Sequence, residues 1–191
     1  MIVAFDTSVL VYLFDEQANA PIDAATGAPV SECKERLDFL IVSLQREKAK
    51  IVIPTPALGE LLVKAQQAAP EWLAILHKSR HFRIAGFDER AAVEFAATQA
   101  ERIASGQKNE GASRAKAKFD DQIVAIAAIE GAAVIYSDDP HIKKLAGSRF
   151  EVIGVADLPL PPQDAQFSLQ LDQQEEPVAS SSPSDEDAVP K

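Results

Sequence analysis

The chain has 191 residues and a formal net charge of −10, from 19 basic and 29 acidic side chains. Hydrophobic residues make up 47% and charged residues 25%, which is the balance of a soluble chain that can bury a core of its own. The apolar runs are far shorter than the roughly 20 residues of a membrane-spanning helix. A single cysteine, Cys33, excludes an internal disulfide framework and a cysteine-based zinc site. The first residues lack the basic segment and cleavage site of a secretory signal, so we expect a cytoplasmic protein without a membrane partner.

Short apolar segments predict five strands, at Ile2–Phe5, Ile51–Ile53, Phe82–Ile84, Ala133–Tyr136 and Glu151–Val155. Helical patterns separate these segments and begin near Thr7, Ser31, Thr55, Trp72, Asp88, Lys118 and Pro140. Strands that alternate with helices and are apolar throughout indicate a parallel sheet covered on both faces. The expected fold is a three-layer α/β/α domain with a mostly parallel, roughly five-stranded sheet.

Turn and cap residues predict where some of these helices begin and end. Ser31, Thr55 and Asp88 are predicted helix N-caps, and Gly131 is predicted to end the helix that begins at Lys118. The glycine-containing segment Ser105–Ala117 is expected to be a mobile loop.

The last part of the chain differs in composition from the rest. Beyond Pro162 it is rich in Gln, Ser, Asp, Glu and Pro and has no periodicity, so we expect a domain over residues 1–158 and an acidic disordered tail over residues 159–191. Residues 163–191 carry a net charge of −6, which leaves −4 for residues 1–162. An acidic chain is unusual for a nucleic-acid-binding protein, but a charge held mostly in a tail does not exclude that function.

Acidic side chains occur where predicted strands end or predicted helices begin: Asp6, Glu60, Asp120, Asp121, Asp138 and Asp139. In open parallel sheets, ligand sites lie at the carboxyl ends of the strands. A cluster of carboxylates there is repulsive unless a cation compensates it. Mg²⁺ and Mn²⁺ prefer oxygen ligands of this kind, so the pattern indicates a divalent-metal site.

Each acid also has an interpretation without a metal. Asp6, Asp139 and one of the Asp120–Asp121 pair are at positions where they could cap helices, and Glu60 could be a solvated helix residue. The histidines fit no metal-binding spacing and are expected at the surface: His77, His81 and His141. Glycine-rich nucleotide-binding motifs and the nucleophile motif GxSxG are absent from the sequence.

Four segments together resemble the PIN-domain ribonucleases, in particular the VapC-type toxins, and occur in that family's order: Ile2–Leu10, Pro54–Leu61, Lys118–Ala127 and Ile135–Asp139. The resemblance covers about residues 1–155. It implies a four-acid site that binds Mg²⁺ or Mn²⁺ and hydrolyses RNA phosphodiester bonds to 5′-phosphate and 3′-hydroxyl ends. Carried over, Asp6 is the central metal ligand, Glu60 the second acid and Asp120 the third.

Two aspartate pairs leave the register of the third and fourth acids open. The third acid in the family is followed by an aliphatic residue, a small residue and a glycine, and that pattern favours Asp120 over Asp121. The fourth acid is Asp138 or Asp139: Ser137, the expected hydroxyl residue two positions earlier, favours Asp139, whereas the spacing from Asp120 favours Asp138. The expected metal ligands are therefore Asp6, Asp120, Asp138 and Asp139. Supporting contacts are expected from Ser137, Thr7 and Asp121.

An RNA-binding loop and a partner protein complete the sequence-based hypothesis. The segment Arg102–Lys118 holds five basic residues and one acid, and we expect Arg114, Lys116 and Lys118 to hold the RNA, although a merely solvated charge run fits equally well. The resemblance implies a toxin restrained by a cognate antitoxin protein, and a homodimer is expected. The alternative is a non-catalytic PIN-fold module that binds RNA or protein.

Overall fold

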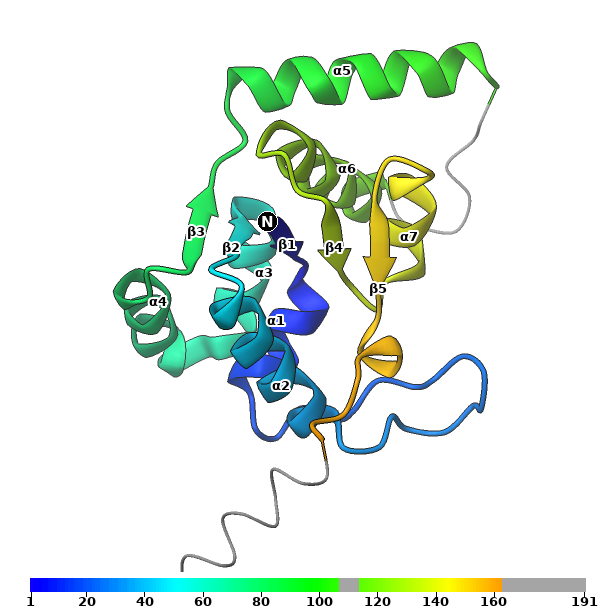
Figure 1. Cartoon of the computed structure of the whole chain (residues 1–191). Helices are drawn as coiled ribbons and strands as arrows, with labels where there is room; N and C mark the ends of the chain where they lie inside the picture. Colours follow the sequence, from blue (N-terminus) through cyan, green and yellow to red (C-terminus); the bar gives the residue numbers. More distant parts are fainter. Residues whose placement is uncertain (107–113, 163–191) are drawn as a thin grey trace, which may run out of the picture. The chain divides into compact units, whose positions relative to one another are not determined.

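The chain is described by a computed structural model over residues 1–106 and 114–162, with the backbone alone for residues 114–116. A compact unit spans Met1–Leu160. It contains a five-stranded sheet in the order β3-β2-β1-β4-β5 (Figure 1). All neighbouring strands in the sheet are parallel. The strands are β1 Ile2–Phe5, β2 Lys50–Pro54, β3 Phe82–Ala85, β4 Val134–Tyr136 and β5 Glu151–Ile153. The predicted parallel sheet is confirmed, with β5 ending two residues earlier than expected.

Helices on both sides of the sheet make up the outer layers and confirm the predicted fold class. The helices of the described residues are α1 Thr7–Phe14, α2 Cys33–Arg46, α3 Thr55–Ala65, α4 Ala69–Lys78, α5 Glu89–Ala104, α6 Arg114–Ile129 and α7 Pro140–Ala146. Two short 3₁₀ turns cover Gln66–Ala68 and Val155–Asp157. None of the helices described is long and apolar enough to cross a membrane.

The sheet has its topological switch point beside its central strand. From β1 the chain adds β2 and then β3 on one side, and it later adds β4 and then β5 on the other. Val3, Ala4 and Phe5 of β1 are fully buried, as expected for a strand covered on both faces. Ligands of open parallel sheets bind outside the strand ends at such a point. Asp6 follows β1 and Ser137 follows β4, so both lie at this edge.

Several helix boundaries differ from the sequence-based prediction. Ser31 does not cap α2, because the helix begins at Cys33 after Glu32, whose backbone is left-handed with φ of 53°. Thr55 is the first residue of α3 rather than its cap. The predicted N-cap of α5 is confirmed, since the Asp88 side chain accepts a hydrogen bond from the Ala91 N–H at 2.9 Å.

Helix α6 starts earlier and stops where expected. It begins at Arg114, so the predicted loop Ser105–Ala117 is wrong for its last four residues; residues 107–113 lie outside the described part of the chain. Ile123, Ile126 and Ala127 are buried at helical spacing and hold the helix against the core. Gly131 follows in the left-handed conformation at φ of 73°, which favours glycine and ends the helix. Of the expected tail over residues 159–191, residues 163–191 also lie outside the described part.

Candidate active site

Asp6 is a buried acid at the switch point. Its side chain is 5% exposed, and its Oδ2 accepts hydrogen bonds from Ser137 Oγ at 2.8 Å and Ser8 Oγ at 3.1 Å. Asp6 precedes α1 but its side chain makes no capping hydrogen bond, so the capping interpretation is wrong. Burial raises the pKa of Asp6, and the hydroxyls of Ser137 and Ser8, together with the nearby backbone N–H groups of Thr7 and Ser8, oppose this rise only in part.

The same two hydroxyls fix the turn between β4 and α7. Ser8 Oγ accepts from the Asp138 N–H at 3.1 Å, and Ser137 Oγ accepts from the Asp139 N–H at 3.0 Å. Each serine therefore donates to Asp6 and accepts from the turn, which sets the direction of both hydroxyl hydrogens. The aspartate pair that follows β4 is thus positioned directly by Asp6 and its neighbours.

Glu60 joins this group from α3. Its Oε2 accepts a hydrogen bond from Thr7 Oγ1 at 2.7 Å. Thr7 is the residue after Asp6, so the contact brings the Glu60 carboxylate to the start of α1. Glu60 is exposed, but its carboxylate is anchored to the candidate site rather than being merely solvated.

The adjacent aspartates of α6, Asp120 and Asp121, point in different directions. Neither residue caps the helix, because both lie more than a turn inside it. Asp121 faces α5: Arg102 Nη2 lies 2.6 Å from its Oδ1, and Gln99 Nε2 donates to its Oδ2 at 2.6 Å. Asp120, which is 5% exposed, instead has its Oδ2 at 2.7 Å from Nδ1 of His141. The structure therefore brings Asp120, and not Asp121, to the element that carries Asp139.

Two sequence-based expectations about neighbouring side chains are corrected by these contacts. His141 is not a free surface residue: its side chain is 13% exposed and touches Asp120. Its Nδ1–H is the donor that the carboxylate requires. Arg102, counted among the bases of an RNA-binding loop, is 14% exposed and paired with Asp121. Lys118 is exposed on α6, while the side chains of Arg114 and Lys116 lie outside what the structure describes.

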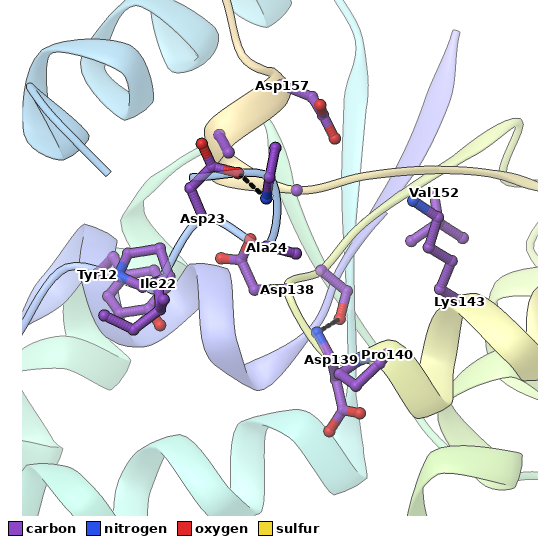
Figure 2. A pocket seen from close by; sticks show the side chains of 15 residues that line it. Tyr12, Ile22, Asp23, Ala24, Asp138, Asp139, Pro140, Lys143, Val152 and Asp157 are labelled. Carbon is purple, nitrogen blue, oxygen red and sulfur yellow. Dashed lines mark hydrogen bonds between the residues drawn. The ribbon is translucent and has the colours of Figure 1, made fainter. Parts of the chain in front are cut away.

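Asp138 and Asp139 also point in different directions (Figure 2). Asp139 caps α7 through its Oδ1, which accepts from the His141 N–H at 2.7 Å, so the predicted cap is confirmed. Asp138 Oδ1 accepts from the Val155 N–H at 2.9 Å. A Cβ atom on Gly154 would lie 2.8 Å from that oxygen, so only glycine leaves room for it.

The Asp138 carboxylate lines a cavity of about 530 Å³, which Figure 2 shows. Tyr12 and Asp23 line the same cavity, with Lys143 and Asp157 further along its wall. Burial raises the pKa of Asp138, and the charges of Asp6 and Asp157 raise it further. Within the described residues, Asp138 Oδ2 is buried without a hydrogen-bond partner.

These acids have the donor chemistry of a hard divalent cation. Asp6 carries a buried charge whose hydrogen-bond partners are neutral hydroxyls, and within the described residues it makes no ion pair. A cation would stabilise that charge. Among residues 1–106 and 114–162, no three carboxylate, histidine or cysteine side chains are grouped so that they could hold a metal ion. Mg²⁺ is commonly held by one or two carboxylates with water and substrate phosphate, so the residues present fit such an ion.

Comparison with known proteins shows similarity in structure but not in sequence. No protein-family model matches the sequence, and no curated protein matches it. VapBC2 from Rickettsia felis, solved with a promoter DNA fragment, is similar with a TM-score of 0.56 and 15% identity over 81% of this chain and 98% of that chain. DNA-bound VapBC from Salmonella typhimurium gives a TM-score of 0.51 and 14% identity over 81% and 98%. Mycobacterium tuberculosis VapC20, described as a sarcin–ricin loop cleaving toxin, gives 0.50 and 16% over 76% and 95%.

The chain has the PIN fold. In this fold Asp6 follows β1, and Asp138 and Asp139 follow β4. Thr7 joins Glu60 to the start of α1, and His141 joins Asp120 to α7. Sequence reasoning missed the contact between His141 and Asp120, because no spacing rule links the two residues. The sequence gives a partial indication that Asp121 pairs with α5. Two adjacent residues of a helix point in different directions, so only one of Asp120 and Asp121 can face the site.

Proposed function

We propose that this chain is a divalent-metal-dependent endoribonuclease and the toxin of a toxin–antitoxin pair. The observation that carries the proposal is the buried Asp6 carboxylate at the switch point of the sheet, which has hydroxyl donors and no cationic partner among the described residues. The PIN fold supports it, because one solved structure with this fold is described as a toxin that cleaves the sarcin–ricin loop. The substrate class we assign is RNA.

The residues of the site have separate tasks in this proposal. Asp6, Asp120 and Asp139 would hold Mg²⁺ or Mn²⁺, with Asp138 as the alternative fourth acid, and Glu60 completes the set. Such an ion, when bound, stabilises charge on phosphate oxygens and lowers the pKa of water.

The neighbouring side chains orient these carboxylates. Ser8 and Ser137 hold Asp6 through Oδ2, and Thr7 holds Glu60. The His141 ring holds Asp120. A carboxylate fixed in this way can orient an attacking water and accept its proton.

A partner protein belongs to the same proposal. Two of the similar structures are VapBC complexes bound to DNA, and on that likeness we assign a cognate antitoxin as the partner class. Expression of the chain alone should arrest growth of the host. Co-expression of the protein encoded by the adjacent gene should relieve the arrest and should yield a complex that copurifies with the chain.

Cleavage of labelled single-stranded RNA by the full chain tests the enzymatic part. Chelator-treated protein should be inactive, and Mn²⁺ or Mg²⁺ should restore cleavage that leaves 5′-phosphate ends. Asp6→Asn should lower the rate by more than about a hundredfold, since losing even a group behind a metal ligand costs about 10- to 100-fold. Asp38→Asn, the same change at an exposed aspartate of α2, should keep the wild-type rate. RNA binding without metal-dependent cleavage would instead indicate the non-catalytic PIN-fold module.

A further inference from the structure

An open groove lies between α3 and α6, beside the candidate site. It has a volume of about 640 Å³ and is lined by Thr55, Pro56, Gly59, Glu60, Val63, Lys64 and Phe119. Helices α3 and α6 pack against each other, so the groove is built on two regular elements. It adjoins the candidate site through Glu60, which is one of its walls.

Two large apolar side chains are exposed side by side in the lining of this α3–α6 groove. Val63 is 78% exposed and Phe119 is 46% exposed, although the opposite face of α6 is buried in the core. A PIN fold that needed Phe119 only for stability would bury it, since burying such a side chain is favourable by about 1.5–3 kcal/mol. Neighbouring apolar side chains left in solvent at the rim of a site are typical of a surface that binds something.

The charges around the α3–α6 groove favour a polyanion as the occupant. Lys64 lines the groove and Lys118 is exposed next to Phe119. Within the described residues, neither lysine makes an ion pair or a side-chain hydrogen bond. The acid in the wall, Glu60, accepts a hydrogen bond from Thr7 and belongs to the four-acid set. An aromatic face beside unpaired cations is the combination by which proteins hold single-stranded nucleic acid.

We propose that the α3–α6 groove binds an unpaired nucleobase of the RNA substrate, stacked on Phe119, with a neighbouring phosphate held by Lys64. The inference rests on the proposed function and specifies its substrate as single-stranded RNA. A base held here lies next to Glu60, so it would bring the adjoining phosphodiester toward the acids. An apolar side chain of a partner protein could also fill the groove, but it would have no need of Lys64 and Lys118.

Gly59 supplies a variant that fills the groove without replacing any of the acids. It lies in α3, its φ is not left-handed, and a Cβ atom there would meet nothing within 4 Å. Gly59→Leu should therefore fold normally and fill the space where the base is expected. Gly59→Ala adds a single carbon and serves as its matched control.

The test measures binding and cleavage by the full-length chain in parallel. Binding uses a short mixed-sequence single-stranded RNA that carries 2-aminopurine, with the Asp6→Asn protein so that no cleavage occurs. Phe119→Ala and Gly59→Leu should each weaken binding about tenfold and abolish the quenching of 2-aminopurine, as loss of a stacking partner requires. Phe119→Trp should retain both. Ile103→Ala, at an apolar residue of α5 that is 79% exposed, should change neither.

Cleavage by the same substitutions in the otherwise wild-type chain separates the two proposals. If Phe119→Ala and Gly59→Leu leave KM, affinity and quenching unchanged while the wild-type chain cleaves RNA, the groove does not bind a base and the inference is wrong. If the wild-type chain cleaves no RNA with Mn²⁺ or Mg²⁺, the proposed function has failed. In that case base quenching on Phe119 would still be expected of an RNA-binding site, and its absence would overturn the inference separately.

Discussion

At Asp6, a buried negative charge is held by two neutral hydroxyl groups. Its pKa is raised by burial, so the ionised form destabilises the metal-free fold at neutral pH, and this penalty disappears as the pH falls below the unfolded pKa of about 4. Asp6→Asn should therefore raise the melting temperature of the metal-free protein at neutral pH. An amide oxygen can still accept from Ser8 and Ser137. The gain should vanish at acid pH.

Thermal unfolding at several pH values, with and without Mn²⁺, checks this expectation. Mn²⁺ should raise the melting temperature of the wild-type chain and leave that of the Asp6→Asn variant almost unchanged, because ligand binding stabilises only a fold that holds the ligand. A variant that melts lower than wild type at neutral pH would show that the Asp6 carboxylate stabilises the fold.

Gly154 is a second residue for which one close contact predicts the effect of a substitution. A Cβ atom at this position would lie 2.8 Å from Asp138 Oδ1, the oxygen that accepts from the Val155 N–H. Gly154→Ala should break this hydrogen bond or push the turn aside and lower the free energy of unfolding by about 1–3 kcal/mol. Gly86→Ala, where a Cβ meets nothing within 4 Å, should have little effect. Equal denaturant midpoints for the two variants would contradict the close contact.

At the scale of elements, helix α6 carries adjacent acids with different roles. Asp121 is tied to Arg102 and Gln99 of α5, whereas Asp120 touches His141 of α7. Asp121→Asn should lower the free energy of unfolding by about 3 kcal/mol, since it leaves Arg102 without its partner, and should retain metal-dependent cleavage. Asp120→Asn should abolish cleavage with a smaller loss of stability. Denaturant unfolding and cleavage rates of both variants decide the register, and the reverse pattern would identify Asp121 as the acting acid.

Elements with strong apolar patterns were predictable from the sequence, and those held together by long-range polar contacts were not. The five strands are apolar runs, so their existence and the position of Asp6 after β1 followed from local pattern. The start of α6 was missed because the charged residues Arg114 and Lys116 follow a polar segment with two glycines, Gly106 and Gly111, a composition shared by loops and exposed helix ends. The contact between His141 and Asp120 depends on how α6 and α7 pack, and no local pattern encodes it.

At the scale of the whole molecule, an acidic chain that binds RNA must concentrate its positive charge. Residues 1–162 have a net charge of −4, and Arg102 is engaged by Asp121 and so does not contribute to an RNA-binding surface. The bases that the sequence places nearest to the third acid are Arg114, Lys116 and Lys118. Of these, Lys118 is exposed on α6, next to Phe119 of the α3–α6 groove. Binding through a few such residues makes affinity depend strongly on salt.

Changing Arg114, Lys116 and Lys118 together to Gln should therefore weaken RNA binding and flatten its salt dependence. On single strands the slope of log affinity against log salt should fall by about 0.7 for each phosphate that the variant no longer neutralises. Cleavage of RNA already bound should change less, because the four acids are untouched. The control changes Lys34, Lys48 and Lys78 to Gln, which removes the same charge from exposed positions on other elements. Equal slopes for the two triple variants would show that the net charge alone matters, and that the start of α6 does not contact the RNA.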